Sequence, residues 1–197
     1  MLIKYGCASL RAIEEKDNDL LLKLINTPEI DKWVGNIHLP VSSEGQKKWM
    51  ETYKNDDATI RLMIELSNGK TIGMIILQNI DYRNANAEIG IKIDFTQKQN
   101  RLKNDVDDAY KALLSFAFNE LNLNCIYANV SEDNEHSINF HNRNNFSNDG
   151  RIRSKMYKNG KYNDVICFSI TKAEFFSNLN AYNVRGGAVD NYLRGVA

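Results

Sequence analysis

Cysteine and histidine are the residue types of this 197-residue chain with the broadest chemistry, because both bind metals and both become reactive near neutral pH. The three cysteines, Cys7, Cys125 and Cys167, are odd in number and widely spaced, which argues against a disulfide framework or a Cys-pair zinc motif. The three histidines are scattered without ligand spacing. We therefore expect no metal site, and we interpret the cysteines as small buried hydrophobic residues in a reducing compartment.

Carboxylates gather at the start of one predicted helix. Asp105, Asp107 and Asp108 fall in its first turn, where the helix dipole favours negative charge. A bound diphosphate would be repelled by the same three acids. Three lysine or arginine residues within 97–108 match them in number, so this segment carries no net charge.

A predicted strand over 87–94 has two chemically different faces. Isoleucines at every second position predict that one face is buried. The residues that alternate with them, on the opposite face, are Glu88, Gly90 and Lys92.

The hydrophobic pattern around these residues predicts an α+β protein with a mixed sheet. Strands are expected over 3–13, 60–66, 71–77, 87–94, 123–130, 151–157 and 165–171. Helices are expected near 17–27, 43–53, 105–121 and 133–143. Asn-Gly pairs at 68–69 and 159–160 predict hairpin turns, of type I′ at the first. This order is not a regular strand–helix alternation, which disfavours a Rossmann fold or a TIM barrel.

Five local strings follow one another in a fixed order over about residues 8–171. They are Ser9-Leu10-Arg11 leading into Asp17–Leu24, then Asn68–Gly73, Ala87–Ile91, Ala112–Asn124 and Val130–Phe146. In this order they resemble the GNAT superfamily of acyl-CoA-dependent N-acetyltransferases, and within it the RimJ/RimL-like branch. The resemblance implies a mostly antiparallel seven-stranded sheet with helices on both faces and with its fourth and fifth strands splayed apart. It also implies a domain over 1–174, followed by a tail or short added element over 175–197.

The resemblance implies acetyl-CoA as co-substrate, bound between the splayed strands and at the N-terminus of the following helix. The residues carried over as its contacts are Ile91, Lys92, Ile93, Arg101, Leu102, Lys103, Asn104, Asp105, Val106, Asn134, Phe140 and Arg143.

The implied reaction is direct attack of a primary amine on the acetyl thioester. His141 takes the place of the family's tyrosine acid, and Glu88 the place of a base that acts through water. Tyr162 is a second candidate proton donor, and Trp33 and Trp49 are expected to wall the acceptor site. Structural alternatives remain open: a surface histidine at 141, a satisfied sheet-face carboxylate at 88, and core tryptophans.

The phosphate loop departs from the family pattern Q/R-x-x-G-x-G/A, because residues 101–106 contain no glycine. Asn104 can adopt the left-handed conformation, whereas Val106 cannot do so cheaply. The sequence therefore leaves a second function open, a GNAT-fold binding or regulatory module without catalysis.

Equal numbers of basic and acidic residues, 25 of each, argue against a general nucleic-acid binder. No apolar run approaches the roughly 20 residues of a membrane span, and no signal peptide is evident at the start. We expect a cytoplasmic monomer or homodimer that acetylates a protein N-terminus, an amino sugar or a small metabolite.

Overall fold

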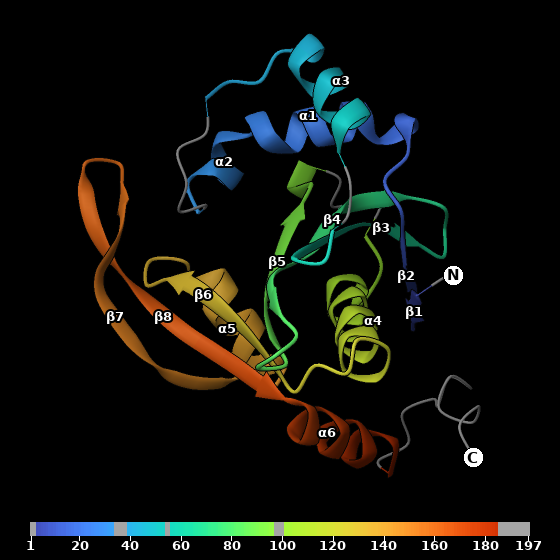
Figure 1. The fold of residues 1–197 in the computed structure, drawn as a ribbon, viewed down its shortest axis with the longest axis vertical. Coiled ribbons are helices and arrows are strands. Elements are labelled where there is room, and N and C mark those ends of the chain that lie inside the picture. The colour runs from blue at the N-terminus through green and yellow to red at the C-terminus, as the bar shows by residue number, and fades with distance from the viewer. Residues whose placement is uncertain (1–2, 34–38, 54–55, 97–100, 185–197) are drawn as a thin grey trace.

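The chain forms one eight-stranded sheet with helices on both faces (Figure 1). The structure, a computed structural model, describes residues 3–33, 39–53, 56–96 and 101–184. Along the sheet the strand order is β1-β2-β3-β4-β5-β6-β8-β7, and only β5 and β6 are parallel neighbours. The strands are β1 (Ile3–Tyr5), β2 (Ala8–Arg11), β3 (Thr59–Leu66), β4 (Thr71–Asp81), β5 (Asn86–Ile93), β6 (Cys125–Ser131), β7 (Ser147–Lys158) and β8 (Lys161–Thr171).

Six α-helices and a short 3-10 helix accompany these strands within the described residues, and the last helix follows β8. They are η1 (Glu15–Asp17), α1 (Asn18–Asn26), α2 (Pro28–Asp31), α3 (Ser43–Thr52), α4 (Asp105–Asn119), α5 (Glu135–Arg143) and α6 (Lys172–Val184). None of these described helices is long and apolar enough to cross a membrane.

Two apolar clusters lie on opposite faces of the sheet. The larger one joins α4, α5 and α6 to one face and includes Ile75, Ile89 and Phe118. The smaller one joins α1 and α3 to the other face and includes Met63 and Met74. Because neighbouring strand residues point to opposite faces, this division confirms the expected helices on both sides. Figure 1 shows α1, α2 and α3 grouped at one end of the sheet and α6 at the other.

The first predicted strand is in fact a hairpin, and this gives eight strands in place of the seven expected. Gly6 adopts a φ of 52°, and β1 folds back on β2 with Tyr5 opposite Ala8. A Cβ atom on Gly6 would stand 2.2 Å from the Asp108 Oδ2 atom. A glycine is therefore needed here both for its φ and for its lack of a side chain.

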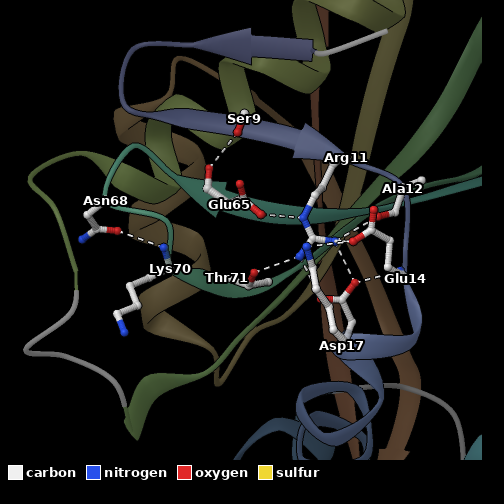
Figure 2. Close-up of polar contacts among 10 residues, drawn as sticks. Ser9, Arg11, Ala12, Glu14, Asp17, Glu65, Asn68, Lys70 and Thr71 are labelled. Atoms are coloured by element: carbon white, nitrogen blue, oxygen red, sulfur yellow. Dashed lines mark hydrogen bonds and ion pairs between the residues drawn. The ribbon is translucent and has the colours of Figure 1, made fainter.

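The two Asn-Gly hairpins differ in their turns. Asn159 and Gly160 both have positive φ, 52° and 81°, as a type I′ turn requires. In the first hairpin only Gly69 is left-handed, with φ 77°, and the Asn68 side chain accepts the Lys70 N–H at 3.1 Å (Figure 2). The type I′ prediction at 68–69 is therefore wrong, and Asn68 acts through its side chain instead.

Arg11 ties the end of β2 to three other parts of the chain (Figure 2). Its guanidinium binds both carboxylate oxygens of Asp17 at 2.7 and 2.8 Å, Glu65 at 2.6 Å and the Thr71 hydroxyl at 2.9 Å. Asp17 is only 3% exposed. Burial alone would raise the pKa of Asp17, but hydrogen bonds from Arg11 and from the Glu14 N–H outweigh it and lower that pKa. This pair fixes α1 to the sheet.

Helix α6 crosses the boundary expected at residue 174. It follows β8 without a break, and its Phe175 and Leu179 side chains join the large cluster, where Phe175 packs against Phe118. Residues 185–197 of the expected tail lie outside the described residues.

Candidate active site

The parallel strands β5 and β6 separate along the sheet. They pair at only three positions, of which the last joins Glu88 to Tyr127. β5 nevertheless continues to Ile93, paired with β4, and β6 continues to Ser131, paired with β8. Each strand thus has an inner edge without a ladder partner in the described part of the chain. Backbone donors and acceptors on such an edge are available to an extended ligand.

Glu88 marks the point where the two strands part. Its Oε2 accepts hydrogen bonds from the side-chain amides of Gln78 at 3.2 Å and Asn79 at 2.9 Å, and its Oε1 accepts one from Asn129 at 3.0 Å. A carboxylate offers about four acceptor positions, so the three amides leave one for water or substrate. The carboxylate is therefore well oriented and keeps one acceptor position.

A β-bulge in β4 positions one of these amides, that of Asn79, next to Glu88. The β4–β5 register shifts between Gln78 and Asp81, and Asn79 has a φ of 53° within this shift. Bulges redirect side chains, and this one turns an amide toward Glu88. Single-strand alternation could not have predicted this contact.

Gly90 leaves open space beside Glu88. The two residues share one face of β5, and a Cβ atom built on Gly90 would meet no atom of the residues that the structure describes within 4 Å. Lys92 follows on the same face and is half-buried. Open space bordered by a carboxylate and a lysine is therefore present on the face that carries α1 and α3.

At the start of α4, backbone N–H groups bind a carboxylate from the chain itself, that of Asp105. Asp105 is 4% exposed, and its carboxylate accepts the N–H groups of Val106 at 2.7 Å and Leu102 at 3.3 Å. It also forms a two-pronged ion pair with Arg101. Asn104 precedes it in the left-handed conformation, φ 66° and ψ 14°, as the sequence allowed. An aspartate therefore uses donors that elsewhere bind external anions.

The other two first-turn acids of α4 also have partners within the chain. Asp107 accepts hydrogen bonds from Arg143 at 3.0 and 3.2 Å and from Asn144 at 2.8 Å, which ties α4 to the end of α5. Asp108 accepts the Cys7 N–H at 3.0 Å. Burial raises the pKa of the Cys7 thiol to about 11, together with a side-chain hydrogen bond to Asp108 and the negative charge of that residue.

His141 is buried between α4 and the sheet. It is 5% exposed, stacks on Phe168 with ring centres 5.2 Å apart, and has a partner on each ring nitrogen. Nδ1 lies 2.7 Å from the Ser137 carbonyl, which can only accept, so Nδ1 carries the proton. Nε2 then accepts the Tyr110 hydroxyl at 2.9 Å. Burial lowers the pKa of His141, although the Ser137 hydrogen bond acts in the other direction.

Comparison with known proteins identifies the fold. A family model described as "Acetyltransferase (GNAT) domain" matches residues 9–147. The chain belongs to the GNAT acetyltransferase family.

Individual relatives support this assignment and the expected RimJ/RimL-like branch. The chain is 30% identical over 174 residues to the "Putative ribosomal N-acetyltransferase YdaF" of Bacillus subtilis, covering 85% of this chain and 92% of that protein. It is 30% identical over 172 residues to the uncharacterized N-acetyltransferase p20 of Bacillus licheniformis, covering 85% and 94%. The Vibrio cholerae spermidine N-acetyltransferase, solved with CoA and spermine, shares the fold at a TM-score of 0.76 and 24% identity, covering 86% and 98%.

The protein is thus an acetyl-CoA-dependent GNAT N-acetyltransferase that acts on an amine. The comparisons favour the enzyme over the non-catalytic module that the glycine-free loop left open. The splayed strands expected from the resemblance are β5 and β6.

The predicted site residues of this GNAT protein fall into separate groups. Glu88 and the β5 residues Ile91, Lys92 and Ile93 lie on the separating strands, and residues 101–106 lie at the start of α4. Asn134 caps α5 by accepting the Ser137 N–H at 3.1 Å. Phe140 packs edge-on against Tyr110 at 4.7 Å. Ile91, Lys92 and Ile93 thus lie on the same strand as Glu88, whereas the other groups lie on α4 and α5 or just before these helices.

Tyr162 lies apart from Glu88, whereas Trp49 lies in α3 on the same face of the sheet. Tyr162 is 69% exposed near the tip of the β7–β8 hairpin, 5.0 Å from the ring of Tyr157. Trp49 stacks on Tyr53 at 4.9 Å and packs, partly buried, against the small apolar cluster. Trp33 follows α2, and the ammonium nitrogen of Lys32 lies over the Trp33 ring, 4.1 Å from the ring centre.

Two sequence interpretations need correction. His141 is not a surface histidine, because Tyr110 and Phe168, far away in the sequence, enclose it. The cysteines are only partly buried, and Cys167 lies within 3.5 Å of the Asn129 amide oxygen. Sequence analysis also missed Tyr110, Asn79 and Asn129, and no local motif marks any of them.

Proposed function

We propose that this enzyme transfers the acetyl group directly to a primary amine, with Glu88 as the base. The observation that carries the proposal is the Glu88 carboxylate, held by three amides where β5 and β6 part and next to the open space over Gly90. A base must reach the proton it removes, directly or through one water, and Glu88 has an acceptor position left for this.

The proton and bond changes balance within this scheme. The amine nitrogen forms a bond to the acetyl carbon while the carbon–sulfur bond breaks, and the sulfur leaves as a thiolate. Glu88 takes the proton that the amine loses, through a water, and the thiolate gains a proton from solvent. The solved Vibrio cholerae relative, which contains CoA together with the amine spermine, supports an amine acceptor for this fold.

Acetyl-CoA supplies the activated acetyl group, and residues on three elements of this chain would hold it. The inner edge of β5 at Ile91–Ile93 fits an extended arm, because none of the described strands pairs with it there. Arg101–Val106 at the start of α4, with Asn134, Phe140 and Arg143 on α5, would take the remainder. Of these, Lys103 is exposed, whereas Arg101 and Arg143 are already paired with aspartates.

In this scheme the leaving thiolate does not receive its proton from His141. Both nitrogens of this ring are hydrogen-bonded inside the protein, and burial lowers the pKa of the ring. We therefore assign His141 to the packing of α5 against α4, and no side chain to protonation of the sulfur.

The variant Glu88→Gln tests the base. It keeps the size and the oxygen of the side chain but cannot accept the amine proton, so kcat should fall by about 10²- to 10⁴-fold. Thiol release from acetyl-CoA with a panel of primary amines measures this. The control is Glu44→Gln, an exposed carboxylate on α3 that should leave kcat unchanged. An unchanged kcat in Glu88→Gln, with acetyl-CoA binding intact by calorimetry, contradicts the assignment of the base.

A further inference from the structure

Lys92 is a half-buried cation on the active-site face of β5. It lies opposite Met74 of β4, two residues beyond Gly90 on the same face. Within the described residues its ammonium forms no hydrogen bond or ion pair. Burial lowers the pKa of Lys92, the charge of Arg61 lowers it further, and the charge of Asp31 opposes both. A lysine in this state gains from any anion that reaches it.

Arg61 adds a second cation to this corner. It is half-buried on β3, and it belongs to the cross-strand row that runs through Ile76 to Gly90. Its guanidinium carbon lies 5.9 Å from the ring centre of Tyr53, whose hydroxyl donates to the Arg61 carbonyl at 3.1 Å. Arg61 is thereby held on the face that Lys92 and Glu88 share.

The Asp31 carboxylate, whose charge raises the pKa of Lys92, already forms an ion pair with another residue. Asp31, in α2, forms an ion pair of 3.0 Å with Lys158, the last residue of β7, whose side chain is largely buried. The charges that act on Lys92 are thus the cation Arg61 and the acid Asp31, and the acid is shared with a second lysine, Lys158. Such an environment attracts an anion and repels a second cation.

Gly90 separates this basic corner from Glu88. The Cα atoms of Glu88 and Lys92 are four residues apart on one strand, about 13 Å at 3.3 Å per residue. Glu88 is held by its three amides, but the long Lys92 side chain can lean over the open space at Gly90, which shortens the span between the two charged ends. A small molecule with two functional groups can therefore reach both ends.

We propose that the acceptor is a small amine that also carries an anionic group, a carboxylate or a phosphate, which pairs with Lys92 while the amine faces Glu88. The inference rests on the proposed function, because it uses Glu88 as the base. It separates this chain from a polyamine acetyltransferase, since a polycation would meet Lys92 and Arg61 with like charge.

Matched amines test the proposal in the thiol-release assay. We would compare β-alanine with its amide, phosphoethanolamine with ethanolamine, and spermidine with all four. The anionic amines should have kcat/KM values at least about tenfold above their neutral partners, as a charge-assisted contact provides. Whichever pair differs more identifies the anion as carboxylate or phosphate. Spermidine should be the poorest acceptor.

The variant Lys92→Met removes the charge and keeps the apolar stem. It should lower kcat/KM for the anionic amines by about 10- to 100-fold, and by clearly more than for their neutral partners. Lys92→Arg should restore the preference, and Arg61→Met should reduce it, which guards against a folding defect in one variant. Lys70→Met, at an exposed hairpin turn, is the matched control.

Two outcomes separate this inference from the function on which it rests. Equal kcat/KM for anionic and neutral amines, or an equal loss for both in Lys92→Met, overturns the anionic acceptor and leaves the acetyltransferase proposal standing. Absence of thiol release with every amine, while acetyl-CoA binds by calorimetry, overturns both.

Discussion

Replacing His141 with phenylalanine distinguishes a packing role from an acid role. The substitution removes the acceptor of the Tyr110 hydroxyl, which is fully enclosed between α4 and α5. A buried hydroxyl without a partner costs about 1–3 kcal/mol. The Ser137 carbonyl belongs to the helix, so loss of its bond to Nδ1 adds little. A phenyl ring would retain the stacking on Phe168.

We therefore expect His141→Phe to lower the free energy of unfolding by about 1–3 kcal/mol. At about 2–4 °C per kcal/mol for a chain of this size, Tm should fall by several degrees. The double variant Tyr110→Phe/His141→Phe removes the stranded hydroxyl and should recover most of the loss. Urea titration of the four proteins of this cycle gives the coupling energy between the two side chains.

The pH dependence gives an independent check. Burial lowers the pKa of His141 below the value near 6.5 that an unfolded histidine has. Between these two values the unfolded state binds more protons, so stability falls as pH decreases below about 6.5. His141→Phe should remove this part of the slope. The packing assignment is refuted if the variant keeps the wild-type Tm and coupling is absent, while kcat drops 100-fold or more.

Two further substitutions probe the fold and the start of α4. Asp17→Asn should destabilise the protein by about 1–3 kcal/mol in urea titration, because Arg11 loses one of its two carboxylate partners and keeps Glu65. Since the pKa of Asp17 is lowered, the wild-type pair should contribute its stability above pH 4 and lose it as pH falls through the folded pKa; a pH-independent difference between wild type and variant would contradict this. Asp105→Asn frees Arg101 and should tighten acetyl-CoA binding by about 3- to 10-fold in calorimetry; weaker binding would mean that Asp105 supports the site.

Local sequence patterns predicted a strand or a turn correctly where the conformation depends only on residues close together in the chain. The alternation of isoleucine over β5 and the paired positive φ angles of Asn159 and Gly160 need only neighbouring residues. The family strings likewise led to the correct fold, because they reflect the same short segments in a fixed order.

The parts that sequence could not predict depend on residues far apart. The reversal at Gly6 is fixed by Asp108, and the orientation of Glu88 is fixed by amides from β4 and β6. The burial of His141 depends on Tyr110 and Phe168, so helical periodicity alone left it on the surface. The glycine-free loop could be recognised, but not the carboxylate of Asp105 that occupies its donors.

The contact between the Cys7 N–H and Asp108 also constrains when the protein folds. It joins residues 101 positions apart, and it anchors the turn between the two strands at the sheet edge. During synthesis at about 5–20 residues per second, the partner of this turn leaves the ribosome roughly 5–20 s after the turn itself. The amino-terminal edge of the sheet therefore waits for α4, and the first part of the chain to be made is among the last to reach its final structure.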